Sequence, residues 1–150
     1  MTTARVAILI SGGGSNMVSL LKAMEKADFN AKPVLVFSNV PGCAGLERAN
    51  EFGVPTAALD HRDFAGDRIA FEDRLHAKLE EFSPSVICLA GFMRVLSPSF
   101  VRRWQGKMLN IHPSLLPKYP GLNTHKRAIE NGDKEAGCTV HIVTEELDGC

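Results

Sequence analysis

The sequence lacks an apolar stretch long enough to cross a membrane. Near the start, the uninterrupted apolar run Val6–Ile10 has five residues. A spanning helix needs about 18 or more, and a signal-peptide core needs about 7–15. The absence argues against a helical membrane protein and against a cleaved leader. We therefore expect a cytoplasmic protein with no membrane partner.

An excess of charge of either sign is also missing. Seventeen Lys and Arg residues balance seventeen Asp and Glu residues, so the formal net charge at pH 7 is zero. Proteins that bind nucleic acid or anionic lipid usually present a broad basic surface. The balance argues against both partners, but it leaves room for a small charged pocket.

Cysteine is scarce, and its spacing does not fit a metal site. Cys43, Cys88, Cys138 and Cys150 form neither a Cys-x-x-Cys pair nor a Cys/His cluster at zinc-ligand spacing. We expect reduced, mostly buried thiols and no metal. No repeat, low-complexity tract or linker divides the 150 residues, which predicts a single domain over residues 1–150 with one ordinary hydrophobic core.

What the chain does contain is a regular alternation of short apolar runs and amphipathic stretches. Compact β-branched and apolar runs indicate buried strands, and apolar residues repeated every three or four positions indicate helices. The predicted strands are Arg5–Ile10, Val34–Phe37, Thr56–Leu59, Val86–Ala90, Met108–Ile111 and Gly137–Val143. The predicted helices are one that Ser15 or Asn16 caps and that carries Met17–Met24, then Ala44–Phe52, Arg68–Phe82, Pro98–Arg103 and Thr124–Asn131.

This repeated strand–helix–strand order predicts a fold of the α/β class. We expect a doubly wound, mainly parallel sheet flanked by helices on both faces. In such sheets ligands bind beyond the carboxyl ends of the strands. The segments predicted to lie there are Ser11–Asn16, Gly91–Leu96, Asn110–Gly121 and Thr144–Gly149.

The segment Ser11–Asn16, with sequence SGGGSN, stands between the first strand and the first helix. Glycines let backbone N–H groups approach an anion, and a helix N-terminus adds partial positive charge, so the segment fits a phosphate site. It is not a P-loop, because no Lys-Ser or Lys-Thr follows, and Met17 occupies the place of the third glycine of a dinucleotide fingerprint. A tight turn with Ser15 as an ordinary helix cap remains the alternative.

The tripeptide Asn110-Ile111-His112 is the most informative short segment. Side chains alternate along an extended chain, so Asn110 and His112 share one face. An amide can donate to a developing oxyanion, and an imidazole can exchange a proton beside it. Asp148, 36 residues later, could hold such an imidazole in its charged form; a solvated acidic loop is the alternative.

Arginines at two of the predicted element ends are further candidates. Arg68 opens a predicted helix and Arg94 lies in the turn after a predicted strand. Either could pair with a ligand carboxylate. Ordinary solvated surface is the alternative for both.

Together these segments resemble the folate-dependent formyltransferase family, and within it the phosphoribosylglycinamide formyltransferases, also called glycinamide ribonucleotide transformylases. The resemblance runs essentially from end to end. It rests on the blocks Ile8–Asn16 (ILISGGGSN), Leu89–Ser97 (LAGFMRVLS), Asn110–Gly121 (NIHPSLLPKYPG) and Val143–Gly149 (VTEELDG). The third block is typical of formyl-folate enzymes in general, and the first block favours this subgroup.

The resemblance implies a Rossmann-like formyltransferase fold and a reaction of de novo purine biosynthesis. A formyl group passes from 10-formyltetrahydrofolate to the amine of glycinamide ribonucleotide, without a metal. Asn110 and protonated His112 are implied to stabilise the tetrahedral oxyanion, with Asp148 supporting His112. The implied nucleotide-binding residues are Gly14, Ser15 and Asn16. The implied folate-binding residues are Arg68, Met93, Arg94, Val95, Leu96, Asn110, Thr144, Glu145, Glu146, Leu147 and Asp148.

Two departures from the family pattern affect these expectations. Asn123 stands where many members carry a histidine, so this position offers an amide in place of an imidazole. Members usually continue beyond the Asp148 loop by one or two strands and a helix, whereas this sequence stops at Cys150. We therefore expect a C-terminally truncated fold, with an exposed sheet edge, weak nucleotide binding and little activity.

Other functions remain open at this point. The nearest are two other formyl-folate enzymes, the methionyl-tRNA formyltransferase and the formyltetrahydrofolate hydrolase. The first is expected to carry an added basic domain and the second an added N-terminal domain. An inactive nucleotide- or folate-binding fragment is a further alternative. A dinucleotide oxidoreductase is disfavoured, because Ser38-Asn39 supplies no acidic ribose ligand. Both a monomer and a homodimer fit the sequence.

Overall fold

The structure is a computed structural model that describes residues 3–26, 30–112 and 139–142. Its strands are β1 (Ala4–Ile10), β2 (Ala31–Ser38), β3 (Thr56–Ala58), β4 (Val86–Leu89), β5 (Met108–His112) and β6 (Thr139–Ile142). Its helices are α1 (Ser15–Met24), α2 (Ala44–Glu51), the 3₁₀ turn η1 (His61–Phe64), α3 (Arg68–Phe82) and α4 (Pro98–Arg103). No helix in the described ranges is long and apolar enough to span a membrane.

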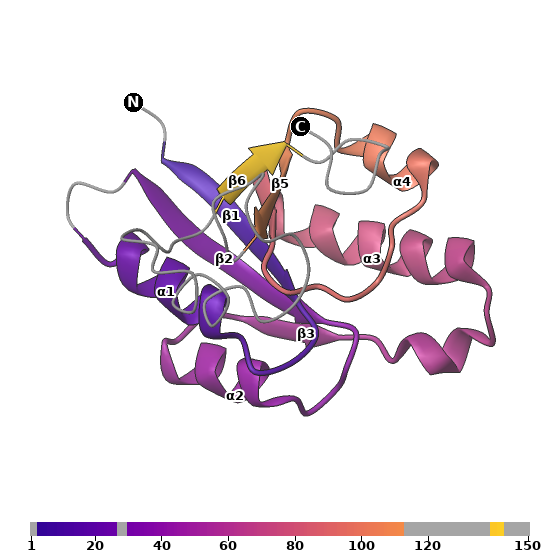
Figure 1. The fold of residues 1–150 in the computed structure, drawn as a ribbon, viewed down its shortest axis with the longest axis horizontal. Coiled ribbons are helices and arrows are strands. Elements are labelled where there is room, and N and C mark those ends of the chain that lie inside the picture. Colours follow the sequence, from indigo (N-terminus) through magenta and orange to yellow (C-terminus); the bar gives the residue numbers. More distant parts are fainter. Residues whose placement is uncertain (1–2, 27–29, 113–138, 143–150) are drawn as a thin grey trace, which may run out of the picture.

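The strands form a single sheet in the order β3-β2-β1-β4-β5-β6. Neighbouring strands from β3 to β5 run parallel, and β6 pairs antiparallel with β5. Figure 1 shows α1 and α2 on one side of this sheet and α3 and α4 on the other. The predicted doubly wound, mainly parallel α/β fold is therefore confirmed.

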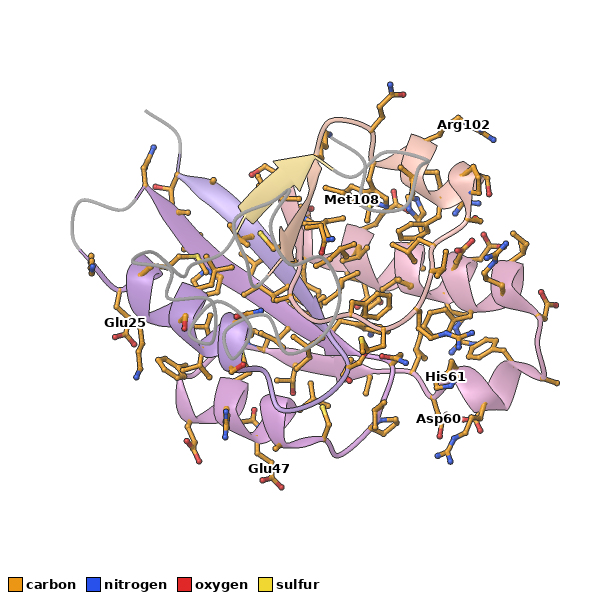
Figure 2. All side chains as sticks on the ribbon, viewed as in Figure 1. Glu25, Glu47, Asp60, His61, Arg102 and Met108 are labelled. Carbon is orange, nitrogen blue, oxygen red and sulfur yellow. The ribbon has the colours of Figure 1, made fainter. Side chains whose placement is uncertain are left out.

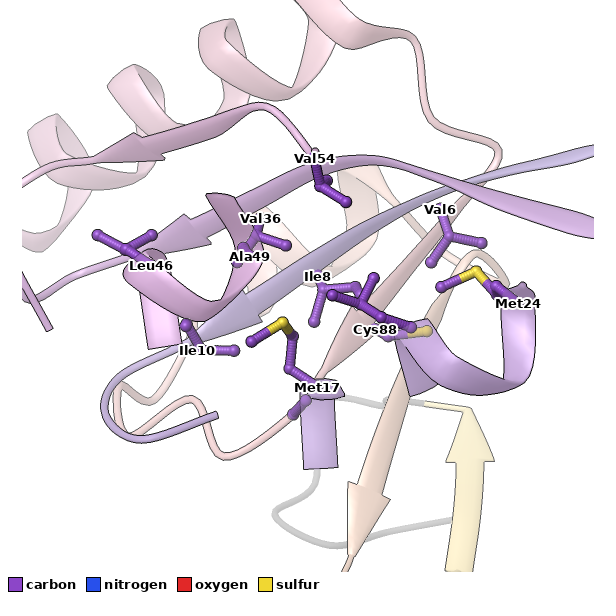
Figure 3. Packing of buried hydrophobic residues seen from close by; sticks show 12 residues of the cluster. Val6, Ile8, Ile10, Met17, Met24, Val36, Leu46, Ala49, Val54 and Cys88 are labelled. Atoms are coloured by element: carbon purple, nitrogen blue, oxygen red, sulfur yellow. The ribbon is translucent and has the colours of Figure 1, made fainter. Parts of the chain in front are cut away.

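Strand β1 explains why both faces need a helical cover. Its residues from Ala7 to Ile10 are completely buried, and successive side chains point to opposite faces of the sheet. Ile8 and Ile10 pack in one cluster against α1 and α2 (Figure 3). Ala7 and Leu9 pack in the other cluster against α3 and α4. Each buried Ile or Leu side chain contributes roughly 1.5–3 kcal/mol to this packing.

Most predicted element bounds hold because strong local signals mark them. Helices α3 and α4 begin and end at the predicted residues: Asp67 caps α3 by accepting from the Ala70 N–H at 3.0 Å, and Ser97 caps α4 by accepting from the Phe100 N–H at 3.3 Å. Gly53 follows α2 with φ 75°, as a residue beyond a helix C-terminus often does.

The cap predicted for α1 is wrong. Neither Ser15 nor Asn16 caps the helix; Gly14 does, with φ 74° and ψ 29°, and no side chain accepts from the first turn. A second difference lies in β2, which starts at Ala31 rather than Val34. The predicted helix Thr124–Asn131 lies outside the described residues.

Candidate functional site

The strand order reverses direction at one place in the sheet, between β1 and β4. The chain leaves β1 toward β2 on one side and later returns to β4 on the other. The connections that follow these two strands therefore separate and leave a crevice, which is where ligands bind in doubly wound sheets. A pocket of about 300 Å³ lies there; we call it the switch-point pocket.

One wall of the switch-point pocket is the glycine loop, Ser11–Gly14, together with the first residues of α1. Gly14 has a left-handed backbone, and a Cβ atom there would lie 2.7 Å from the Met17 Cε. The first turn of α1 has neither a side-chain cap nor an acidic residue. Among the described residues no side chain caps the N–H groups of this turn, which suit an anion, and Ser15 and Asn16 line the pocket beside them.

A glycine in α2, Gly45, holds the glycine loop in place. The Gly45 N–H donates to the Gly12 carbonyl at 2.9 Å. A Cβ atom on Gly45 would lie 2.6 Å from that carbonyl oxygen and 2.4 Å from the Ile10 Cδ1. Only a residue without a side chain lets α2 approach the loop this closely.

The other wall comes from the β4 loop, Gly91–Leu96. Gly91 turns the chain with φ 77°, and it lines the switch-point pocket together with Met93. Phe92 and Leu96 pack against the core, whereas the intervening Met93 and Val95 expose 69% and 65% of their surface. The loop thus presents two apolar side chains to solvent rather than to the core.

Both ends of the β4 loop are fixed by hydrogen bonds. At its start, the Met93 N–H donates to the Ser11 hydroxyl at 2.7 Å. Beyond its end, Ser97 donates from its N–H and its hydroxyl to the two carboxylate oxygens of Glu72, at 2.7 and 2.5 Å. Glu72 is buried in α3, with 2% of its surface exposed.

A second pocket, of about 190 Å³, opens beside the β4 loop; we call it the arginine pocket. Arg68 at the start of α3 and Arg94 of the β4 loop both line it, and Phe64 and Phe71 supply apolar surface. In the described part of the chain, neither Arg68 nor Arg94 forms an ion pair with a carboxylate. Two such guanidinium groups on one small pocket are suited to a ligand carboxylate.

Two further charged residues line the arginine pocket: Arg62 of the η1 turn and Asp67, the cap of α3, whose carboxylate accepts the Ala70 N–H. Arg62, which also lines it, forms an ion pair with Asp60 at 2.7 Å. The hydrogen bond from the Arg62 side chain is the main cause that lowers the pKa of Asp60 to about 2. Figure 2 shows Asp60 and His61 together at this turn. Arg62 is thus paired with Asp60, whereas within the described ranges no carboxylate forms an ion pair with Arg68 or Arg94.

Asn110 lies on the strand next to the switch-point pocket. It is partly buried and pairs with Leu89, the residue before Ala90 on the pocket wall. The backbone of His112 closes β5 opposite Thr139 of β6. The parallel β4–β5 register therefore brings the end of β5 to the same edge of the sheet as the glycine loop and the β4 loop.

Of the remaining predicted site residues, Thr144, Glu145, Glu146, Leu147 and Asp148 lie outside the described residues. Within the described ranges, no three His, Cys, Asp or Glu side chains gather in a way that could hold a metal ion. The sequence analysis missed three residues that shape the site: Asn39, Gly45 and Glu72. Ser11 belongs to the predicted ligand segment Ser11–Asn16, but it is not among the residues that the resemblance assigns to a ligand.

Comparison with known proteins gives a consistent result. The formyl transferase family matches residues 4–150. The phosphoribosylglycinamide formyltransferase of Escherichia coli is 48% identical over 144 residues, which are 96% of this chain and 68% of that protein. The trifunctional purine biosynthetic protein adenosine-3 of Drosophila melanogaster is 52% identical over 146 residues, and that of Homo sapiens is 48% identical over 145 residues. The chain spans only 11% and 14% of these two longer relatives.

Solved structures show the same likeness. The phosphoribosylglycinamide formyltransferase of Brucella melitensis is 49% identical with a TM-score of 0.85, and the match covers 96% of this chain and 74% of that one. The enzyme of the same name from Coxiella burnetii, solved in complex with CHES, is 42% identical with a TM-score of 0.85. That match covers 98% of this chain and 68% of the other.

Proposed function

Since the chain belongs to the formyl transferase family, we propose that it transfers a formyl group from 10-formyltetrahydrofolate to the primary amine of glycinamide ribonucleotide. The reaction is a step of de novo purine biosynthesis. One observation carries the proposal: the glycine loop and the β4 loop face each other across one pocket, and Arg68 and Arg94 share a second pocket beside it. A phosphorylated substrate and a carboxylate-bearing substrate can therefore meet at one edge of the sheet.

The phosphate of the nucleotide is assigned to the start of α1. Gly14, Ser15 and Asn16 line the switch-point pocket, and among the described residues no side chain caps the N–H groups of the first turn of α1. An anion there gains hydrogen bonds and the favourable end of the helix dipole, worth about 0.3–1 kcal/mol at an exposed site. The zero net charge of the chain is compatible with this mode of binding, because backbone amides supply the attraction.

The folate is assigned to the β4 loop and the arginine pocket. A folate combines an aromatic ring system with a carboxylate tail. The exposed Met93 and Val95 offer apolar contact, together with the backbone from Met93 to Leu96, and the arginine pocket offers Arg68 and Arg94 for the tail. The predicted contributions of Asn110 and of residues 144–148 complete this assignment. No metal takes part in the proposal.

The chemistry is direct attack of the substrate amine on the formyl carbon. A carbon–nitrogen bond forms to the amine, the bond between the formyl carbon and the folate nitrogen breaks, and one proton moves from the amine to that nitrogen. Asn110 and protonated His112 stabilise the negative charge that develops on the formyl oxygen. Asp148 keeps His112 charged and oriented, and it assists proton movement through water.

The remaining expectations belong to the same proposal. The formyltransferase part of the chain acts as one domain, in the cytoplasm, on small molecules and without a nucleic-acid partner. It works as a monomer or a homodimer. The nearest rivals are a methionyl-tRNA formyltransferase and a formyltetrahydrofolate hydrolase, and their reactions differ from the proposed reaction in the acceptor of the formyl group.

The acceptor is therefore what the experiment varies. Initial rates of tetrahydrofolate release from 10-formyltetrahydrofolate are measured for the full-length gene product with glycinamide ribonucleotide, with aminoacylated initiator tRNA, and with buffer alone. We expect release only with the nucleotide, and a loss of about a hundred- to thousandfold in kcat for His112→Ala, the usual effect of removing one oxyanion donor. Release in buffer alone, or only with tRNA, would refute the proposal.

A further inference from the structure

Three segments that are distant in the sequence meet at the hydroxyl group of Ser11. The hydroxyl accepts the Met93 N–H of the β4 loop at 2.7 Å. It donates to the Asn39 side-chain oxygen at 2.5 Å. Ser11 follows β1, Asn39 follows β2, and Met93 follows β4. The hydroxyl thus joins the two walls of the switch-point pocket to a third strand end.

This arrangement leaves the Ser11 hydroxyl no proton for a phosphate. A serine hydroxyl has one donor and two acceptor positions. In the orientation of the Asn39 amide that the structure gives, the single proton points at the amide oxygen. A free lone pair of the hydroxyl would repel an anion rather than bind it. Ser11 therefore belongs to the glycine loop by sequence but does not serve it as an anion ligand.

Asn39 is rigid enough to orient the hydroxyl. Only 2% of its surface is exposed, and its amide nitrogen lies 3.1 Å from the Nδ1 of His61. His61 lines the arginine pocket. Both ends of the Asn39 side chain are therefore engaged, which holds the Ser11 proton away from the switch-point pocket.

The glycine loop does not depend on the Ser11 hydroxyl for its position. Its Gly12 carbonyl accepts from Gly45 in α2, and Gly14 packs against Met17 and Gly45. The β4 loop depends on the hydroxyl more strongly. Between Phe92 and Leu96 its side chains are exposed, and the hydrogen bond from Met93 to Ser11 anchors this exposed part.

We propose that Ser11, oriented by Asn39, is a positioning residue for the folate side of the site. Its hydroxyl accepts the Met93 N–H and so holds the β4 loop in the position in which Met93, Arg94 and Val95 contact the folate. This inference rests on the proposed function, which assigns the β4 loop to the folate. The expected effect differs from what the glycine-rich motif suggests, which is that residues of this loop bind the phosphate. Removing a hydroxyl from the glycine loop should weaken folate binding and leave nucleotide binding unchanged.

The test compares variants at two serines of the same segment. Isothermal titration calorimetry of the full-length gene product measures Kd for tetrahydrofolate and for glycinamide ribonucleotide, each alone. For Ser11→Ala we expect Kd for tetrahydrofolate to rise about 2- to 10-fold, as the loss of one hydrogen bond allows, with Kd for the nucleotide unchanged. Ser15→Ala should show the reverse pattern. Ser11→Thr keeps the hydroxyl and should restore folate binding.

A second readout needs no ligand. Amide hydrogen exchange, followed by NMR, reports whether a donor has lost its acceptor. In Ser11→Ala the Met93 amide should exchange about 2- to 10-fold faster, and the Ser97 amide, which Glu72 holds, should not change. Asn39→Asp retains an acceptor oxygen for the hydroxyl, so Met93 should stay protected in that variant.

Each other outcome has a distinct meaning. If Ser11→Ala weakens nucleotide binding alone, or changes neither Kd value nor the exchange rate of the Met93 amide, the inference is wrong. If the variant raises Kd for both ligands equally, the hydroxyl supports the whole site and the inference is also wrong. If the unaltered protein binds neither ligand, the proposed function fails, and the Met93 exchange rate still decides whether Ser11 anchors the loop.

Discussion

Replacing Gly45 by alanine would drive a methyl group into the glycine loop. The new Cβ would lie 2.6 Å from the Gly12 oxygen, whereas ordinary contact begins near 3.4 Å, so the loop would have to retreat by roughly 0.8 Å. Backbone atoms cannot avoid the methyl group by changing rotamer. The 2.9 Å hydrogen bond from the Gly45 N–H to the Gly12 carbonyl would lengthen as the loop moves away.

Two opposed effects determine how much Gly45→Ala changes the free energy of unfolding. Overpacking costs about 1–3 kcal/mol, and exchanging glycine for alanine within a helix returns about 0.5–1 kcal/mol. We expect Gly45→Ala to lower the free energy of unfolding by about 1–2 kcal/mol. A displacement near 1 Å in a substrate-positioning loop costs up to about a hundredfold in rate, so kcat/KM for glycinamide ribonucleotide should fall about 10- to 100-fold.

Urea unfolding and steady-state kinetics measure the two effects separately. Glu47→Ala is the matched control, because Glu47 is exposed on the same helix and its loss leaves the glycine loop alone. Helix propensity alone predicts that Gly45→Ala stabilises the protein. A variant at least as stable as the unaltered protein, with unchanged kcat/KM for the nucleotide, would refute the steric argument.

Three further predictions concern groups around the core and the site. Burial raises the pKa of the Cys88 thiol to about 11 from an ordinary 9.0. The unfolded state therefore loses the thiol proton first as the pH rises, and the free energy of unfolding should fall above about pH 9 by up to ~1.4 kcal/mol per pH unit. In urea unfolding from pH 7 to 10, Cys88→Ala should lose less stability per pH unit than the unaltered protein. An equal loss in both proteins would contradict the burial of the thiol as the cause. Arg62 lowers the pKa of Asp60 to about 2 from the ordinary 3.8, so the stabilisation of the fold by the Asp60–Arg62 pair is present above about pH 3.8 and disappears as the pH falls through 2. Arg62→Gln should move the Asp60 titration midpoint, measured by NMR, toward 3.8. An unmoved midpoint would count against the pairing. Glu72→Gln leaves one of the two Ser97 donors without an acceptor and should cost about 1–3 kcal/mol in urea unfolding, whereas a loss under about 0.5 kcal/mol would disagree.

Local signals explain how much of the fold could be predicted. The bounds of α4 follow from Ser97 as a cap and Pro98 in the first turn, and Pro84 limits α3. The predicted second strand starts too late because its apolar run begins only at Val34, after Lys32 and Pro33, whereas β2 begins at Ala31. Pro33 is tolerated because the pairing of β3 with β2 begins only at Val36, and the β1–β2 register shifts between Val6 and Ala7, next to Pro33.

The site could be predicted only where a residue type carries the chemistry. Glycines before a helix and arginines at element ends pointed to the two pockets. Gly45 and Glu72 matter because of contacts with residues distant in the sequence, and such contacts leave no local pattern. Gly14 replaced the expected serine cap for a related reason: the close approach of Gly45 and Met17 selects a residue without a Cβ at the turn.

We propose that a formyl group passes to a nucleotide amine at the edge of the sheet between the glycine loop and the β4 loop. The most direct measurement is a single turnover with 10-formyltetrahydrofolate carrying an isotopic label on the formyl carbon, with glycinamide ribonucleotide as acceptor and enzyme in excess. We expect the label to appear on the amine of the nucleotide, and His112→Ala to slow its appearance about a hundred- to thousandfold. Label recovered as formate, or left on the folate while the nucleotide is bound, would contradict it.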